Sequence, residues 1–470
     1  MKKLLVILLS LALLACVPTP EEEYVIQKNA DRPKASAPSE KEDIPTHISA
    51  SFTENGVEIS FDAEPELPAC KHLKSVRSDA VSFEAYNLDR IVKALFGDAP
   101  LYDFDRPLKK DLEADLLQAL QDLAEVKAHP ERYEAGVEYY QRLVDDLRKE
   151  YNAAPDADEL TPITVGWKTN GDATYFCCRG DVGGRFGRLS ILNQHTQEDD
   201  VNSYLTFRYQ YYYKSLTDVH RDDPNAPQPS PAVSREEAIR TATELVSDLG
   251  ADHMAFAACE EGLPEDLYLQ QLAPDAYEHA AWLVYFTYAR DGMQTVYDPT
   301  FTTSGEQDDH QTYAMPLYYE RITVAVDESG VVYLCWRGPT EDRETVSDDV
   351  PALPTDALLP IAAKYLSYLY PVSIAMQEAN DADQAVSLDT LSRGSVVSCS
   401  IRITRMTLGW TQTVSGGTNR TSTRIPVWDF FGTVTRTYEN GETEVSENDL
   451  VSLLTLDAST GARIDRKLGY

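Results

Sequence analysis

Residues 234–250 read SREEAIRTATELVSDLG. Ser234 followed three residues later by Glu237 is a capping box, which begins a helix by satisfying its first free backbone N–H groups. Apolar residues then recur at helical spacing, at Ala238, Ala242, Leu245 and Leu249. Gly250 is typical of a helix C-terminus. The stretch therefore predicts an amphipathic helix whose apolar face needs a sheet or another helix to cover it.

Strand patterns follow this helix. Residues 282–288 and 322–326 are apolar runs, and Ser329-Gly330 predicts a turn that leads into a third run at residues 331–336. A helix, several strands and a closing hairpin thus come in that order.

The same order occurs a second time, with a period of about 120 residues. Thr355 begins another helix that ends at Pro371, and its apolar residues are Leu358, Ala362, Leu366 and Leu369. Further strands are predicted at 401–410, 427–435 and 450–456, then a turn at Thr460-Gly461 and a short strand at 462–464.

This repeated unit resembles the PepSY-like or cystatin-like design, in which one helix lies on a curved antiparallel sheet. The resemblance covers residues 232–470 and rests on that layout and on short matching segments, which are 281–284 (AWLV), 426–430 (PVWDF), 326–330 (VDESG) and 456–461 (LDASTG). It implies two PepSY-like units, 232–350 and 351–470. Proteins of this design are mostly inhibitory or sensory modules of the cell envelope, although a fold does not determine a function.

The chain before these units predicts an α+β domain at residues 46–220. Alternating apolar residues on both sides of Asn55-Gly56 predict a β-hairpin. Helical spacing follows at 108–123 and 130–151, and strands are predicted between 163 and 213. Four prolines between 220 and 233 favour a boundary there. The predicted fold class is α+β: a domain of helices on an antiparallel sheet, followed by the two helix-on-sheet units.

The N-terminus predicts a lipoprotein signal peptide at residues 1–15. Lys2 and Lys3 precede an apolar run at 4–14, which is too short to span a bilayer. The segment 13–16, Leu-Leu-Ala-Cys, resembles a bacterial lipobox, which implies cleavage before Cys16 and lipid attachment to Cys16. The alternative is a soluble secreted protein with a coincidental cysteine. Residues 16–45 are rich in proline and charge and predict a flexible tether.

The first mature residues, 16–21 (CVPTPE) with Val25 and Lys28, are similar to a Gram-positive (Firmicute) lipoprotein family of unknown function. The resemblance implies a protein anchored by lipid on the outer face of the cytoplasmic membrane. It implies no activity.

Composition excludes some partners. The chain has 470 residues, and 43% of them are hydrophobic, which is ordinary for a globular protein. A formal net charge of −35 repels nucleic acid and anionic lipid surfaces. The expected membrane contact is therefore the N-terminal lipid only.

Six cysteines remain once Cys16 is assigned to lipid, and they are Cys70, Cys177, Cys178, Cys259, Cys335 and Cys399. They could form disulfides in an oxidising compartment, remain as buried thiols, or take part in redox or metal chemistry. Cys177 and Cys178 are adjacent in a predicted strand and point to opposite faces, so we do not expect them to bond to each other.

No catalytic motif is present in the sequence. It contains neither Gly-x-Ser-x-Gly nor Ser-x-x-Lys nor His-Glu-x-x-His, and no Cys-x-x-Cys pair for a metal. We predict no catalytic residue, metal site or cofactor. The acidic groups at 198–200 and 308–309 are interpreted as solvated loop charge, with weak calcium binding as an alternative.

An aromatic segment is the strongest candidate for ligand binding. Tyr209, Tyr211 and Tyr213 would share one face of a strand and could present rings and hydroxyls to a sugar or peptide. The alternative is packing within the core.

Together these patterns favour a non-catalytic binding or regulatory module that acts on an extracytoplasmic protein or a wall polymer. One route is an exposed sheet edge that accepts a partner strand. The first alternative is a lipoprotein that captures a solute or glycan in an aromatic cleft. The second is an envelope hydrolase without a recognisable motif.

Overall fold

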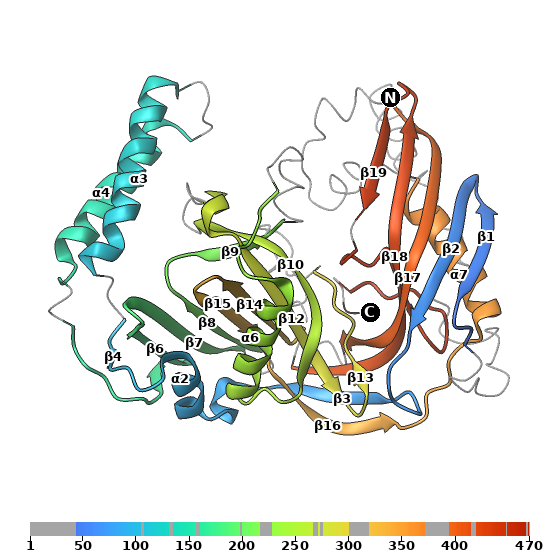
Figure 1. Ribbon diagram of the computed structural model, residues 1–470, viewed down its shortest axis with the longest axis horizontal. Coiled ribbons are helices and arrows are strands. Elements are labelled where there is room, and N and C mark those ends of the chain that lie inside the picture. Colours follow the sequence, from blue (N-terminus) through green and yellow to red (C-terminus); the bar gives the residue numbers. More distant parts are fainter. Residues whose placement is uncertain are drawn as a thin grey trace, which may run out of the picture.

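The computed structural model describes residues 44–104, 108–130, 135–156, 160–197, 200–216, 228–266, 271–272, 276–299, 319–371, 394–414, 420–447, 449–466 and 469. Strands make up 46% of the described residues and helices 24%, so the protein is mostly β. The strands form two large sheets that stand beside each other (Figure 1).

The larger sheet has 12 strands in the order β11-β10-β12-β14-β15-β8-β7-β6-β4, with β5, β9 and β13 paired at its sides. Its strands are β4 (Leu101–Tyr102), β5 (Lys168–Asn170), β6 (Ala173–Val182), β7 (Arg185–Gln197), β8 (Asp200–Arg208), β9 (Tyr212–Ser215), β10 (Met254–Asp266), β11 (Gln271–Leu272), β12 (Ala281–Arg290), β13 (Met293–Gln294), β14 (Arg321–Asp327) and β15 (Gly330–Arg337).

The smaller sheet has eight strands in the order β1-β2-β17-β18-β3-β16, with β19 and β20 paired to β18. Its strands are β1 (Ile48–Glu54), β2 (Val57–Glu66), β3 (Ser75–Ala80), β16 (Thr340–Ser347), β17 (Val396–Val414), β18 (Thr421–Tyr438), β19 (Thr443–Glu447) and β20 (Leu454–Asp457).

The predicted fold class is wrong, because the strands do not close into helix-on-sheet units along the chain. β8 pairs with β15, and β9 pairs with β10. In the other sheet β2 pairs with β17 in parallel, and β3 lies between β16 and β18. The local patterns identify strands, but the pairing joins segments hundreds of residues apart, and no local pattern encodes it.

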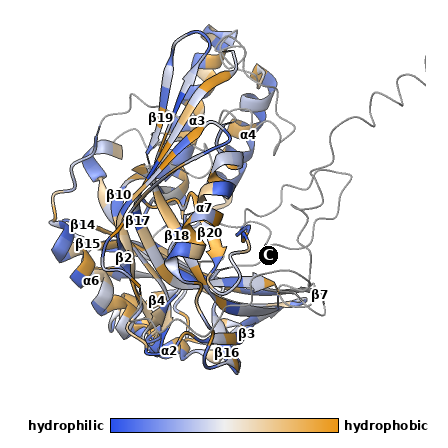
Figure 2. Ribbon diagram, turned by 90° about the vertical axis from the view of Figure 1, so that its right-hand side faces the viewer, coloured by the Kyte–Doolittle hydropathy of each residue, from blue (hydrophilic) through white to orange (hydrophobic). Residues whose placement is uncertain are grey.

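The first predicted helix is confirmed as α6 (Arg235–Asp248). Ser234 caps it, because the Ser234 hydroxyl accepts a hydrogen bond of 3.2 Å from the Glu237 N–H. Ala238, Ala242 and Leu245 are buried where α6 lies on β10, β12, β14 and β15. Figure 2 shows hydrophilic and hydrophobic residues alternating along α6, as an amphipathic helix requires.

The second predicted helix, α7 (Thr355–Leu369), is also present, but its sheet is built differently from the prediction. α7 packs on β1, β2 and β20, so the N-terminal hairpin supplies strands beneath a helix that begins about 300 residues later. The predicted hairpin is confirmed. Asn55 and Gly56 have φ of 51° and 80°, as a tight turn between twisted strands requires.

The remaining helices are α2 (Leu88–Phe96), α3 (Lys109–Ala128) and α4 (Val137–Ala153), with short 3-10 turns η2 (Phe83–Ala85) and η5 (Ala276–His279). α3 and α4 form a helical hairpin that extends away from the sheets in Figure 1. Ala119, Leu123 and Val144 are buried between these two helices, which therefore have a small core of their own.

β17 and β18 form the longest pair and contain an irregularity in the middle. The register shifts between Ile403 and Arg405, so Thr404 is an extra residue on β17. Gly432 lies opposite Ile403, where the carbonyl of Arg402 comes close to it. A glycine is required here because the backbones approach each other.

Candidate functional site

The aromatic candidates are half-buried, and the structure brings only two of them together. Tyr209 follows β8, with its ring 5.4 Å from that of Phe207 and the Arg185 guanidinium 4.1 Å from its centroid. Tyr213, in β9, packs with Tyr209 on the cluster that contains Tyr333.

Tyr211 packs on a different cluster, formed by Leu263, Ala276 and Ala280. Burial raises the pKa of Tyr209, although Arg185 acts in the opposite direction. Packing accounts for much of the surface of these rings, and a ligand face formed by all three tyrosines stays a prediction.

The six cysteines outside the signal segment are thiols in the structure. Cys177 and Cys178 point to opposite faces of β6, and the Cys177 Sγ lies 3.4 Å from the Ser190 Oγ. The register from β6 through β7 and β8 to β15 places Cys177 in the same row as Cys335, three strands away. Strand spacing of about 4.8 Å makes that separation too large for a disulfide.

Burial raises the pKa of Cys178 to about 12 and that of Cys259 to about 12. At pH 8 we expect both to resist iodoacetamide in the folded protein, because a thiol with that pKa holds roughly a thousandfold less thiolate than an ordinary cysteine. Mass spectrometry of alkylated peptides measures the rates, and the chain unfolded in urea is the control. Equal rates in folded and unfolded protein would contradict the burial of these thiols.

Several other sequence candidates lie outside the described residues, namely Cys16, Glu198, Asp199, Asp308 and Asp309. Within the described ranges no group of three His, Cys, Asp or Glu residues is placed to hold a metal ion. Among the helices that the structure describes, none combines the length and hydrophobicity needed to cross a membrane.

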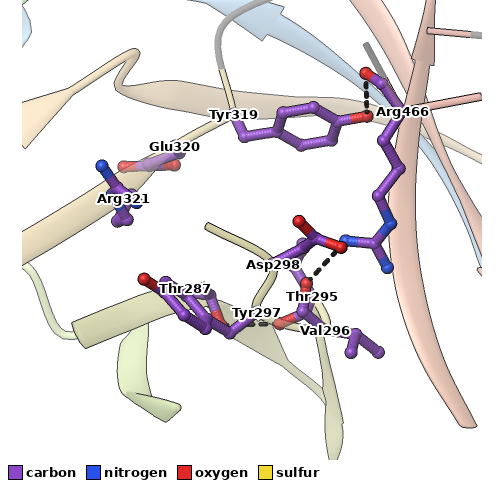
Figure 3. A pocket seen from close by; sticks show the side chains of 9 residues that line it. All are labelled: Thr287, Thr295, Val296, Tyr297, Asp298, Tyr319, Glu320, Arg321 and Arg466. Atoms are coloured by element: carbon purple, nitrogen blue, oxygen red, sulfur yellow. Dashed lines mark hydrogen bonds between the residues drawn. The ribbon is translucent and has the colours of Figure 1, made fainter. Parts of the chain in front are cut away.

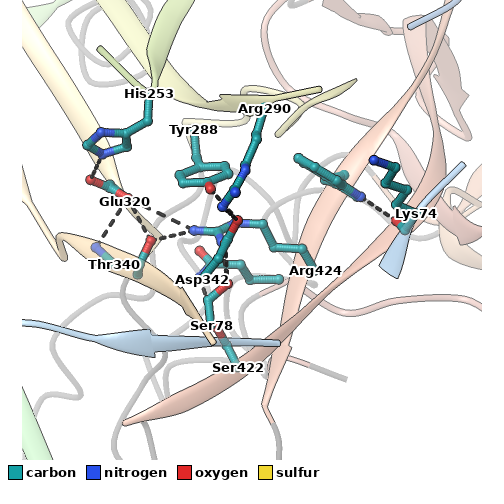
Figure 4. Close-up of polar contacts among 12 residues, drawn as sticks. Lys74, Ser78, His253, Tyr288, Arg290, Glu320, Thr340, Asp342, Ser422 and Arg424 are labelled. Atoms are coloured by element: carbon teal, nitrogen blue, oxygen red, sulfur yellow. Dashed lines mark hydrogen bonds and ion pairs between the residues drawn. The ribbon is translucent and has the colours of Figure 1, made fainter. Parts of the chain in front are cut away.

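Buried charges join the two sheets around Arg424 of β18 (Figure 4). The Arg424 guanidinium is fully buried and donates a hydrogen bond of 2.8 Å to Asp342 on the edge strand β16. It also bonds to the hydroxyls of Ser78 and Thr340, and it lies 3.5 Å from the ring centroid of Tyr288 in the larger sheet. Burial lowers the pKa of Arg424, but Glu320 and Asp342 oppose that effect. We call these residues the Arg424 junction.

Glu320 completes the junction from the larger sheet and is also fully buried. One carboxylate oxygen lies 2.8 Å from His253 Nε2 and accepts a 3.3 Å bond from the Trp336 indole. The other accepts bonds from the Thr340 hydroxyl at 2.6 Å and the Thr340 N–H at 3.2 Å. Both oxygens therefore have partners, as a buried carboxylate requires.

A second buried pair is formed by Arg466 and Asp429, and Arg466 also lines a small recess with Glu320 (Figure 3). Arg466 donates to Asp429 at 2.5 Å and to the Val296 carbonyl at 3.0 Å. Burial disfavours the charge on Arg466, yet the carboxylates of Asp429 and Asp298 hold the Arg466 pKa above its ordinary value. Tyr297, Tyr319 and Arg321 also line this recess.

These interior charges were missed in the sequence, although a signal for them exists. Residues 424–432 read RIPVWDFFG, an apolar strand in which Arg424 and Asp429 are the two charged residues. A charge inside such a run is buried and must be paired. Each of these charges has a partner from another element: Arg424 pairs with Asp342 of β16, and Asp429 pairs with Arg466. Contacts to the larger sheet come from Arg290 of β12, which pairs with Asp342, and from Glu320, which lies 4.0 Å from Arg424.

The exposed candidate is the outer edge of β1. A two-residue turn is flanked by a hydrogen-bonded pair, here Glu54 with Val57, and such pairs then alternate along the ladder. Ser49, Ser51 and Thr53 belong to the non-hydrogen-bonded pairs that lie between them, so their backbone N–H and C=O groups point away from β2. No described strand pairs with that side of β1.

The opposite edge of the same sheet, β16, differs in character. β16 reads TEDRETVS, so four consecutive charged residues occupy it, and its pairing with β3 shifts register twice. Charges and bulges are the usual means by which an edge strand avoids pairing with other chains. β1 reads ISASFTE, so only its last residue is charged. Its pairing with β2 has a continuous register without a bulge.

No protein-family model and no curated protein matches this chain. Among solved structures, an uncharacterized protein from Eubacterium rectale matches 90% of this chain and 94% of its own, with 13% identity and a TM-score of 0.39. A similarity of that size carries no argument about fold or function.

Proposed function

We propose that this protein is a non-catalytic, lipid-anchored binding module of the cell envelope, and that its partner adds an extended segment to the sheet along β1. The observation that carries the proposal is the contrast between the two edges of the smaller sheet. β16 has the charges and bulges that prevent strand addition, whereas β1 lacks them.

The geometry of β1 suits strand addition. Ser49, Ser51 and Thr53 are exposed and small, so a partner backbone can approach the edge closely. Their outward N–H and C=O groups would bond to the partner, and such main-chain bonds give affinity in known cases of strand addition. Ile48 is buried and Ala50 and Phe52 are half-buried on the other face, which fixes β1 against the core.

The interior supports a non-catalytic role. Arg424, Glu320, Asp342, Asp429 and Arg466 are charged residues with little or no exposure, and each is held by hydrogen bonds or ion pairs within the protein. A catalytic acid or base needs to reach a substrate proton, and these groups are directed at one another instead.

Ser51→Pro tests the edge directly. Proline removes the outward N–H of residue 51 and leaves the bonds between β1 and β2 intact, because that N–H does not face β2. Peptides selected from a random display library on the wild-type protein should bind the variant at least about tenfold more weakly, since a backbone bond is lost and the ring obstructs the edge. Fluorescence anisotropy with synthetic copies of those peptides measures the affinities.

Ser51→Thr is the matched control, because it keeps the N–H and should retain binding. Hydrogen exchange adds a second measurement: bound peptide should slow exchange at Ser49, Ser51 and Thr53, whose amides face outward. Peptides that bind Ser51→Pro as tightly as wild type, or that protect amides elsewhere, would contradict the proposal.

A further inference from the structure

We infer that the strand accepted by β1 alternates apolar and basic side chains, an inference that rests on the proposed function. β2 carries acidic residues on the face shared with Ser49, Ser51 and Thr53, and the other face of β1 is apolar. An added strand would present alternate residues to these two surfaces.

The acidic surface consists of Glu58, Asp62 and Glu64 of β2, all of them exposed. Thr53 lies opposite Glu58, and Ser49 lies opposite Asp62. A strand added outside β1 would be about 4.8 Å from β1 and about twice that from β2. Because the intervening residues are small, a Lys or Arg side chain can extend over Ser49 or Thr53 to these carboxylates.

Part of this negative charge is not compensated. Asp62 is 3.4 Å from both His47 and Arg402. Among the described residues, Glu58 and Glu64 form no ion pair. A basic partner would therefore gain new ion pairs there without displacing existing ones.

The opposite surface requires apolar partners. Ala50 and Phe52 are only half-buried at the edge, and the Phe52 ring packs edge-on against Phe61 with centroids 5.8 Å apart. The next strand would complete the cover over these side chains, and burial of apolar area is favourable at about 25 cal/mol per Å². Positions that alternate with the basic residues are thus expected to be Val, Ile or Leu.

Other occupants fit less well. A second copy of this chain would bring its own β1, which has no basic residue, and a net charge of −35 opposes the approach of two copies. A polysaccharide lacks the regularly spaced amides that would satisfy the backbone of the edge.

Four nine-residue peptides test the inference: KVKVKVKVK, SVSVSVSVS, EVEVEVEVE and the block sequence KKKKKVVVV. We expect the alternating Lys–Val peptide to bind tightest and the Glu–Val peptide weakest. Glu58→Gln/Glu64→Gln should weaken Lys–Val binding about fivefold, since exposed ion pairs contribute about 0.2–1 kcal/mol each. The control is Glu113→Gln/Glu328→Gln, which makes the same change in net charge at exposed sites on α3 and the β14–β15 turn. It should have little effect on the affinity for the Lys–Val peptide.

Hydrogen exchange at Ser49, Ser51 and Thr53 separates the outcomes. Equal affinity for the Lys–Val and Ser–Val peptides, with protection of these amides, would overturn the inference and leave the edge proposal intact. Binding of the block peptide as tightly as Lys–Val without protection would show general charge attraction and would overturn the inference. No protection by any of the alternating peptides would overturn the edge proposal as well.

Discussion

Arg424→Met is expected to lower the free energy of unfolding by about 3–5 kcal/mol, the usual cost of removing one partner from a buried ion pair. Methionine preserves most of the volume but leaves Asp342 and Glu320 without the guanidinium that lies between them. It also removes the cation that faces the Tyr288 ring and the donors to Ser78 and Thr340. Urea denaturation followed by circular dichroism measures the change.

Arg402→Met is the matched control. Arg402 also pairs with an aspartate, Asp62 at 3.4 Å, but its side chain is 64% exposed. Water screens such a pair, so the expected cost is at most about 1 kcal/mol. Asp342 keeps its 2.6 Å ion pair with Arg290 in the Arg424→Met variant, so the fully buried Glu320 carboxylate should account for most of the lost stability. Equal effects of the two arginine substitutions would show that the Arg424 junction does not hold the sheets together.

Gly432→Ala is expected to cost about 3 kcal/mol, because overpacking between paired strands has no easy relief. A Cβ at position 432 would lie 1.9 Å from the Arg402 carbonyl oxygen, and that atom belongs to the backbone of β17. The strands would have to separate at the bulge around Thr404, where they are already irregular.

Gly166→Ala is a suitable comparison, since no atom lies within 4 Å of its added Cβ. Its expected effect on stability is within about 0.5 kcal/mol. Thermal unfolding of both variants, followed at 222 nm, tests the difference. A Gly432→Ala protein as stable as Gly166→Ala would mean that β17 and β18 are farther apart at this point than the structure shows.

The elements that could be predicted from sequence are those determined by neighbouring residues. The hairpin at Asn55-Gly56 and the Ser234 cap of α6 depend on fewer than ten residues each, and both are confirmed. The fold class could not be obtained this way. The repeated order of helix and strands suggested two self-contained units, whereas β2 completes the sheet under α7 from the far end of the chain.

The same limit applies to the site. The sequence could suggest that an exposed sheet edge binds a partner strand. It could not identify the edge, because that depends on which strands pair. β1 is an edge strand only in the sheet order that the structure shows. Arg424 and Asp342 are 82 residues apart. Their contact follows from the approach of β16 to β18 through β3, which no spacing in the sequence indicates.

The parallel pairing of β2 with β17 has a consequence for how the protein is made. Arg402 on β17 and Asp62 on β2 are separated by 340 residues. During synthesis the β1–β2 hairpin emerges first, and its inner edge has no partner until most of the chain has followed. Such distant contacts slow folding because a long loop must close before they form. We therefore expect the smaller sheet to assemble only after synthesis is nearly complete, and truncated chains that end before residue 396 to expose β2.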